Sequence, residues 1–327
     1  MIIKSKKVYL LLSGGTILSE SEPMAVEKES DVKDWFLSMP ELAVMAQVEP
    51  VFISGENSGE SGPKLWQKIN AAVFDRLDKA DGFIVTSRPS EALFNAIAMS
   101  FAVLNINQPA VFTGSQLPIL KKELAEKKKG FGGGLGLKAN LINAVQMATT
   151  NLGAVGLLFG NRCLWPAKTR QAAVYSLNVF ESVDESYLAK VDFGISPAEK
   201  INPPQKKPVL KNQFEEKVLA LKYYPGMEAG GLKQLAVGYR GLFIESLALE
   251  PFSQEFLKGL ADAKMPVVVF NRFYVPPFNQ ENLIEIFNLT KETALVKFMW
   301  ALGQTRETSE VRNIMFNEYC GEFIKHR

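Results

Sequence analysis

One threonine stands where a nucleophile of an α/β enzyme would stand. Thr16 follows the apolar run 8–12 and the glycine pair Gly14–Gly15. Such a run predicts a buried parallel strand that ends in a tight turn. Ligand sites in open α/β sheets lie at the carboxyl ends of strands, so the hydroxyl of Thr16 is expected at such a site. A threonine hydroxyl is a weak nucleophile near neutral pH, and its chemistry depends on a neighbour that accepts its proton.

Histidine and cysteine chemistry is not expected. The single histidine, His326, precedes the terminal Arg327, where fraying is expected, so Ser-His and Cys-His catalysis and histidine-ligated metal are not expected. Cys163 and Cys320 are too few for a disulfide framework or a zinc site. No metal or organic cofactor is implied. Any chemistry therefore rests on Thr, Ser, Lys, Asp or Glu.

The composition indicates an ordinary globular protein. The chain has 327 residues with 47% apolar and 22% charged side chains, which predicts a large core and roughly two domains. The 37 basic and 35 acidic residues give a net charge of +2 without a long block of one sign, so no nucleic-acid or membrane partner is expected. The N-terminus lacks an apolar export segment, and a cytoplasmic location is expected.

Strand and helix patterns alternate in the first part of the chain. Apolar runs at residues 82–86, 109–113 and 153–159 predict strands, and residues 91–104 have helical spacing. This alternation predicts an α/β fold whose mostly parallel sheet is flanked by helices, and it makes residues 1–190 the first domain.

Residues 191–216 predict a linker, because they are rich in proline and lysine and lose the apolar period. Residues 217–327 predict a second, smaller α/β domain. Its expected strands are 217–221, 242–245 and 266–270, and its expected helices are 253–264, a helix capped by Thr290, and 309–319.

A glycine-rich segment at residues 130–136 matches neither the dinucleotide-binding fingerprint nor the phosphate-binding P-loop. A flexible loop leading into a helix at 138–149 is the favoured interpretation, with a phosphate cradle as the alternative. The lysine-rich residues 121–129 are interpreted as a solvated helix, with anion binding as the alternative.

Several stretches together resemble the L-asparaginase family, specifically its cytoplasmic bacterial type I branch. Residues 12–17, Leu-Ser-Gly-Gly-Thr-Ile, are similar to the family's first signature, Thr-Gly-Gly-Thr-Ile, and residues 81–86 resemble the strand before its second. Further matching stretches are 112–116, 140–144, 224–227, 297–300 and 321–322. The order and spacing of these stretches carry the resemblance, which covers nearly the whole chain. It implies an asparaginase-like fold and assembly as homodimers or tetramers.

The resemblance also implies hydrolysis of L-asparagine to L-aspartate and ammonia, with Thr16 at the position of the nucleophile. The family activates this threonine with a second Thr, an Asp and a Lys, but the matching positions here hold Pro89, Ser90 and Gln171. Proline has neither a hydroxyl nor an N–H, and a neutral amide does not accept a proton at useful rates. The family reaction is therefore expected to be absent or strongly impaired.

The positions that bind substrate in the family are altered as well. The family's Asp-Ser-Ser-Asn segment corresponds to residues 57–60, and Arg88 stands where the family has glycine. The candidate substrate-binding residues are Ser58, Gly59, Glu60, Arg88 and Ser90. Arg88 is either a surface residue on a remodelled loop, or it projects into the pocket, pairs with Glu60 and excludes an amino-acid substrate. Glu91 either replaces the missing acid or caps a helix.

Two functions from different classes remain open. The first is a pseudoenzyme with a ligand-sensing or scaffold role, in which Thr16 is kept because a small β-branched residue fits the turn. The second is a divergent amidohydrolase that still uses Thr16 on asparagine or a related amide. A lysine or a glutamate carboxylate within hydrogen-bond reach of Thr16 would favour the second. A small amide or amino acid is the expected ligand of either.

Overall fold

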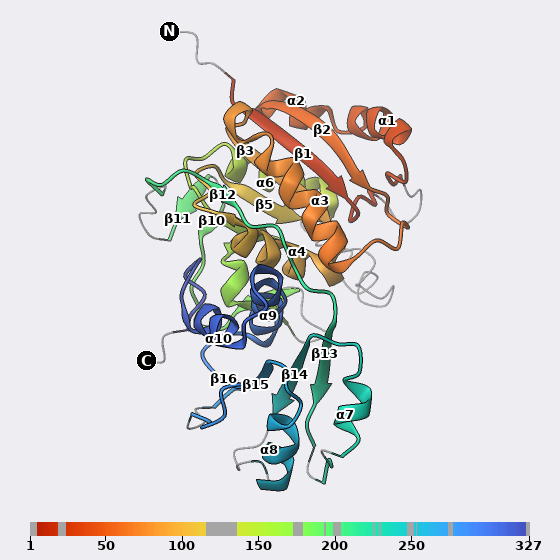
Figure 1. The fold of residues 1–327 in the computed structure, drawn as a ribbon. Coiled ribbons are helices and arrows are strands. Elements are labelled where there is room, and N and C mark those ends of the chain that lie inside the picture. Colours follow the sequence, from red (N-terminus) through yellow and green to blue (C-terminus); the bar gives the residue numbers. More distant parts are fainter. Residues whose placement is uncertain are drawn as a thin grey trace, which may run out of the picture. The chain divides into compact units, whose positions relative to one another are not determined.

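The computed structural model describes residues 5–18, 24–115, 136–172, 179–192, 194–198, 204–224, 226–228, 230–246, 252, 254–273 and 277–324. The chain divides into two compact units, Met1–Leu210 and Lys211–Arg327 (Figure 1). The lysine-rich segment 121–129 and all of the glycine-rich segment except Gly136 lie outside the described residues. Among the described residues, no helix has both the length and the apolar character needed to cross a bilayer.

The first unit contains a large sheet with the strand order β11-β10-β7-β6-β5-β3-β1-β2. Pairing is parallel from β2 through β1, β3 and β5 to β6, and antiparallel from β6 through β7 and β10 to β11. The mostly parallel sheet predicted from the sequence is confirmed. Its strands are β1 Lys7–Ser13, β2 Gln47–Ser54, β3 Gly82–Ser87, β5 Ala110–Thr113, β6 Val155–Leu158, β7 Arg162–Leu164, β10 Ala189–Val191 and β11 Ile195–Pro197.

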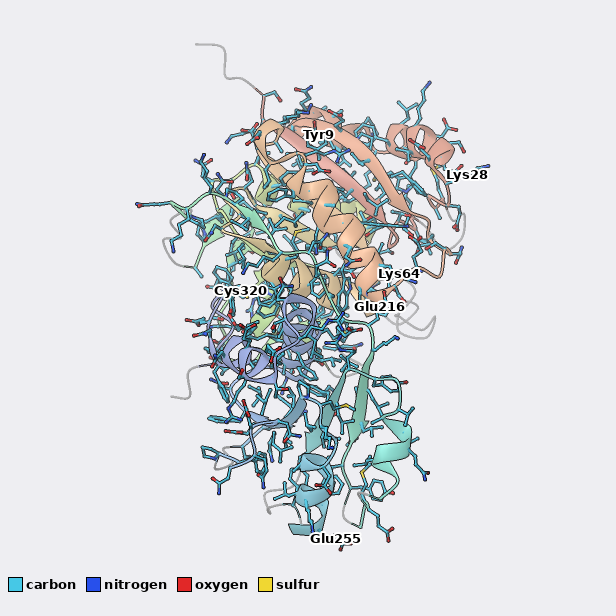
Figure 2. The ribbon with its side chains drawn as sticks, viewed as in Figure 1. Tyr9, Lys28, Lys64, Glu216, Glu255 and Cys320 are labelled. Atoms are coloured by element: carbon cyan, nitrogen blue, oxygen red, sulfur yellow. The ribbon has the colours of Figure 1, made fainter. Side chains whose placement is uncertain are left out.

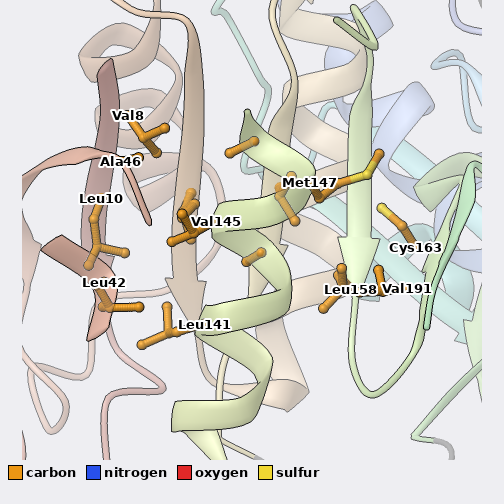
Figure 3. Packing of buried hydrophobic residues seen from close by; sticks show 14 of the residues in the cluster. Val8, Leu10, Leu42, Ala46, Leu141, Val145, Met147, Leu158, Cys163 and Val191 are labelled. Atoms are coloured by element: carbon orange, nitrogen blue, oxygen red, sulfur yellow. The ribbon is translucent and has the colours of Figure 1, made fainter. Parts of the chain in front are cut away.

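Helices cover both faces of this sheet (Figure 1). One face packs against α1, α2 and α6, and α3 and α4 pack together on the other. Figure 3 shows Leu141 and Val145 of α6 pointing toward Leu10 of β1 and Leu42 of α2, and each of these side chains is buried. Burial of one such side chain contributes roughly 1.5–3 kcal/mol, so the layers are held by apolar packing. The helices are α1 Val32–Leu37, α2 Pro40–Met45, α3 Gly62–Phe74, α4 Pro89–Ala102 and α6 Leu137–Ala148.

Short elements complete the first unit. Two small antiparallel sheets pair β4 with β12 and β8 with β9. Their strands are β4 Val103–Leu104, β12 Val209–Leu210, β8 Thr169–Gln171 and β9 Phe180–Ser182, and the 3-10 helices are Glu29–Asp31, Leu77–Lys79 and Pro166–Lys168.

The segment predicted as a linker, 191–216, is not structureless. It contains β11, which pairs with β10, and β12, which pairs with β4. Strands this short leave no apolar period in the sequence, which is why composition alone indicated a linker. Pro197 ends β11 at the edge of the sheet, where its missing N–H costs no ladder bond.

The second unit is built on a parallel sheet with the order β13-β14-β15-β16. The strands and helices predicted in this part of the chain are confirmed, with ends displaced by a few residues. Thr290 caps α9 as predicted, because its hydroxyl accepts the backbone N–H of Thr293 at 3.2 Å. The elements are β13 Val218–Lys222, α7 Leu232–Leu235, β14 Gly241–Ser246, α8 Gln254–Ala261, β15 Val267–Asn271, β16 Leu283–Ile286, α9 Lys291–Gln304 and α10 Thr308–Phe316.

Charged side chains outside these cores extend from the surface. Lys28, Lys64 and Glu255 are examples, and all three are exposed (Figure 2). The polar groups that are buried therefore stand out, and several of them gather at the carboxyl ends of β1, β2 and β3.

Candidate active site

The turn after β1 brings the ends of two strands into close contact. Gly14 and Gly15 have φ angles of +90° and +69°, which glycine adopts without strain. A Cβ at Gly15 would lie 2.1 Å from the carbonyl oxygen of Ser87 at the end of β3. Only glycine fits there, and the turn delivers Thr16 to the carboxyl end of β1, as the sequence predicts.

Thr16 is fully buried, at 0% exposure, and its polar atoms are all engaged. Its hydroxyl donates to Oε2 of Glu56 at 3.1 Å and accepts the backbone N–H of Val26 at 3.2 Å. Its own N–H donates to the same Glu56 oxygen at 2.9 Å, and its carbonyl accepts from the indole of Trp35 at 2.8 Å. Thr16 therefore ties the turn after β1 to three other segments.

Glu56 is the site residue that sequence reasoning missed. It is buried, at 7% exposure, two residues beyond the end of β2, which is the neighbour of β1 in the sheet. Gly55, the residue before Glu56, packs closely against the backbone of Glu27. A Cβ at Gly55 would lie 2.3 Å from the carbonyl oxygen of Glu27. The sequence does show an acidic residue just after a strand. Predicting that this acid contacts Thr16 required knowing that β2 pairs with β1.

Arg88 lies across the ends of the strands and fills space next to the β1 turn. A Cβ at Gly14 would lie 3.4 Å from Cγ of Arg88. The guanidinium donates to the carbonyl oxygens of Glu56 at 2.8 Å and Glu60 at 3.0 Å, and to the carboxylate of Glu91 at 2.8 Å. Arg88 thus joins the loop after β2 to the first turn of α4.

One of the two alternatives for Arg88, an ion pair with Glu60, is contradicted, although the two residues are in contact. Glu60 meets Arg88 through its backbone carbonyl, and its carboxylate pairs with Lys68 at 2.5 Å. The ion-pair partner of Arg88 is Glu91, three residues further along the same helical turn, a spacing at which side chains meet readily. The Lys68 ammonium lowers the pKa of Glu60 despite the opposing effect of burial.

The other predicted positions are placed as follows. The hydroxyl of Ser58 lies 2.7 Å from that of Ser54 and accepts the N–H of Glu60 at 3.2 Å. Ser58 and Gly59 are exposed, and Gly59 has a φ of +69°. Of the positions that the resemblance matched to the family's activating residues, Pro89 and Ser90 lie at the start of α4, where Pro89 is buried and Ser90 exposed, and exposed Gln171 ends β8.

Polar contacts beneath the turn hold β3 against β1 and against α4. The hydroxyl of Ser13 donates to the carbonyl of Thr86 at 2.5 Å, and the side-chain amide of Asn95 donates to the hydroxyl of Ser87 at 3.0 Å. Within the described ranges, no group of three or more His, Cys, Asp or Glu side chains is placed to hold a metal ion. The arrangement offers one buried threonine hydroxyl and one carboxylate in contact, with an arginine bound to the backbone of the loop that carries the carboxylate.

These features define an α/β protein with a threonine and a glutamate in contact at the carboxyl ends of its first two strands, and comparison with known proteins shows its family. A family model described as "Asparaginase, N-terminal" matches residues 7–202, and the chain belongs to the asparaginase family. The resemblance predicted from the sequence is confirmed at this level.

Relatives carry two kinds of name. The chain is 25% identical over 350 residues to a glutamyl-tRNA(Gln) amidotransferase subunit of Metallosphaera sedula, with 97% of this chain and 76% of the relative covered. It is 25% identical over 340 residues to an L-asparaginase of Thermococcus kodakarensis, with 97% and 98% covered. The structure of L-asparaginase I from Vibrio cholerae matches with a TM-score of 0.80 and 23% identity, covering 98% of this chain and 100% of that one, which shows the fold.

Proposed function

We propose that this protein keeps the asparaginase fold in a ligand-sensing or scaffold role and does not hydrolyse asparagine. The observation that carries this proposal is the burial of Thr16, which is 0% exposed and whose hydroxyl is already engaged by Glu56 and Val26. By the resemblance, Pro89, Ser90 and Gln171 stand at the positions of the family's second Thr, Asp and Lys. Acid-base assistance alone is commonly worth about 10²- to 10⁴-fold in rate, so these replacements remove most of the expected acceleration.

Arg88 also competes with any amino-acid substrate. Its guanidinium is a cation that already occupies three acceptors: two backbone carbonyls and the carboxylate of Glu91. A substrate ammonium that used these acceptors would have to displace it. Hydrogen bonds to charged groups contribute about 1.5–3 kcal/mol each, so displacement is costly.

A divergent amidohydrolase is the second candidate, because one contact specifically favours it. Oε2 of Glu56 lies 3.1 Å from the hydroxyl of Thr16, within the reach of a general base that activates a nucleophile. In this reaction Glu56 would take the hydroxyl proton as Thr16 attacks the amide of asparagine or a related compound. The segments around Thr16 would first have to open, since its side chain is closed off from solvent.

Ammonia release from L-asparagine and L-glutamine at high protein concentration separates the two functions. The wild type would be compared with Thr16→Ala, Glu56→Gln and the surface control Arg306→Gly. The scaffold proposal expects the same background rate from all four proteins. Turnover that is lost in Thr16→Ala and reduced in Glu56→Gln, but unchanged in the control, would contradict it and establish the amidohydrolase.

Arg88→Gly tests whether this arginine excludes an amino-acid ligand. If Arg88 occupies the place of a substrate cation, its removal should let L-aspartate or L-asparagine raise the melting temperature in a saturable way, while the wild type shows no shift. Ammonia release should remain at background, because the activating groups are still missing. Equal ligand-induced shifts in both proteins would show that Arg88 does not exclude amino acids.

The expected assembly is a cytoplasmic homodimer or tetramer, and its ligand a small amide or amino acid. The relatives that are named as subunits of an amidotransferase support a role within a larger protein assembly. Light scattering coupled to size-exclusion chromatography would test self-association of the 36.3 kDa chain. A mass of one chain at micromolar concentration would contradict a stable homodimer.

A further inference from the structure

A cavity lies in the first unit, outside the candidate active site. It has a volume of about 440 Å³ and is lined by residues of the β6–β7 hairpin, β9 and β10. Part of its wall is apolar: the rings of Phe159 and Phe180 meet edge to face at 5.1 Å, next to Leu157 and Leu164. Small-molecule sites typically measure about 300–1,000 Å³ and combine such walls with a few polar groups.

Two cations face each other across neighbouring strands at this cavity. Arg162 of β7 and Lys190 of β10 are directly opposite in the antiparallel register, and both line the cavity. Like charges in such a pair destabilise a sheet. Both lie over the ring of Tyr187, at 6.0 Å and 5.6 Å from its centroid. Within the part of the chain that the structure describes, neither forms an ion pair, so their charge is left for an anion.

The acidic residues of the lining do not neutralise this pair. Glu181 is paired with Arg170 at 2.7 Å. Glu185 is exposed and has a left-handed φ of +60°, a conformation that costs a non-glycine residue and often marks ligand sites. A free carboxylate at the cavity would repel a second negative charge, which favours monoanions over dianions.

The turn that carries Glu185 is held in place by the carboxylate of its neighbour Asp184. The Asp184 carboxylate accepts hydrogen bonds from the hydroxyls of Ser182 at 2.9 Å and Ser186 at 2.5 Å. Its second oxygen pairs with Lys168 at 3.1 Å. Because these contacts fix the turn, part of the cavity wall is ordered before any ligand arrives, which reduces the entropy lost on binding.

We propose that this cavity binds a small monoanion with an aromatic body, such as an aromatic carboxylate. The carboxylate would lie between Arg162 and Lys190, relieving their repulsion and accepting charge-assisted hydrogen bonds. The ring would pack against Phe159 and Phe180. This binding site is separate from Thr16 and does not depend on the function proposed for the first site.

The test is a titration of the full-length protein with 4-fluorophenylacetate, followed by its ¹⁹F signal at low salt. Saturable one-site binding is expected, weakening as salt is added because the two cations are partly exposed. The neutral analogue 2-(4-fluorophenyl)ethanol and the ringless anion acetate should both bind more weakly. Equal binding of the neutral analogue, or no saturation by the carboxylate, would overturn the proposal.

Variants assign the binding to this cavity. Arg162→Gln combined with Lys190→Gln should weaken binding roughly tenfold or more, since one charge-assisted hydrogen bond is worth about that factor. Lys206→Gln, an exposed lysine outside the cavity lining, should leave it unchanged. Glu185→Gln adds a readout in the opposite direction, because removing its negative charge should tighten binding. Circular dichroism would confirm that each variant is folded, and unchanged affinity in the folded double variant would refute the site.

Discussion

At the scale of single residues, two glycines with the same backbone angle have different surroundings. Gly15 and Gly59 both have a φ of +69°, but a Cβ at Gly15 would meet a backbone oxygen at 2.1 Å, whereas one at Gly59 would meet nothing within 4 Å. Gly59→Ala should cost about 1–2 kcal/mol of unfolding free energy from the left-handed angle alone. Gly15→Ala should cost roughly 3 kcal/mol or more, because β1 and β3 must separate at the turn. Urea unfolding measures both, and equal losses would contradict this interpretation of the turn.

The same residues show how far the site follows from sequence. The position of Thr16 could be predicted because an apolar strand followed by two glycines is a local pattern. The role of Glu56 could not, because it depends on β2 lying beside β1, which no local pattern specifies. The ion-pair partner of Arg88 was also missed. The sequence analysis considered Glu60, whereas Arg88 pairs with Glu91 because the two side chains lie three residues apart on one helical turn.

At the scale of elements, the turn between β9 and β10 should show a pH dependence set by Asp184. Burial raises the pKa of Asp184, but hydrogen bonds from Ser186 and Ser182 and from the Lys168 ammonium lower it from 3.8 to about 2. A depressed carboxyl pKa stabilises the fold above the ordinary pKa of 3.8, and this contribution is lost as the pH falls toward about 2. Asp184→Asn should therefore cost roughly 1–2 kcal/mol at neutral pH.

Unfolding titrations of Asp184→Asn and the wild type between pH 7 and pH 2 would check this, with the exposed Asp78→Asn as the control. The stability difference between Asp184→Asn and the wild type should be constant down to about pH 4 and shrink below it. A difference that does not change with pH would show that Asp184 acts through packing alone.

A buried ion pair joins α9 to the C-terminal segment of the second unit. Lys297 and Glu322 are both 0% exposed and lie 2.7 Å apart. Lys297 also donates to the carbonyl of Asn317 at 2.6 Å, and Glu322 accepts the N–H groups of Tyr319 and Cys320 at 3.0 Å and 2.9 Å. Removing one partner leaves a buried charge, so Lys297→Met should cost about 3–5 kcal/mol.

A double-mutant cycle with Glu322→Gln tests this coupling. The double variant should lose clearly less than the sum of the two single losses, because neither charge is then stranded. Simple additivity in urea unfolding would show that the pair contributes no mutual stabilisation.

The elements themselves were largely predictable, for a physical reason. Strands such as β1, β3 and β15 can be predicted because each is a continuous apolar run in the sequence. Helix α9 can be predicted because its apolar spacing and its Thr290 cap are local patterns. The strands β11 and β12, which have 3 and 2 residues, carry no such signal and are fixed by partners distant in the chain. The strand order of the large sheet is likewise a tertiary property.

At the scale of the whole molecule, each unit has a core of its own. In the second unit, alternate residues of the sheet pack on opposite faces: Phe243 and Val268 belong to the cluster beneath α9 and α10, and Leu242 and Val267 to the cluster with α8. Every residue of these two clusters lies after Lys211. A unit whose sheet is covered on both faces by its own helices should fold without the rest of the chain.

We therefore expect residues 211–327 to fold when produced alone. Trp300 is the only tryptophan in this segment, is 1% exposed, and donates from its indole to the carbonyl of Lys211 at 2.8 Å, so its fluorescence reports the fold. Emission should be blue-shifted in buffer and move to the red in one cooperative urea transition. Lys297→Met in the same fragment should lower the transition midpoint, as in the full chain. Red-shifted emission in buffer, or a gradual change without a transition, would show that this core requires the first unit.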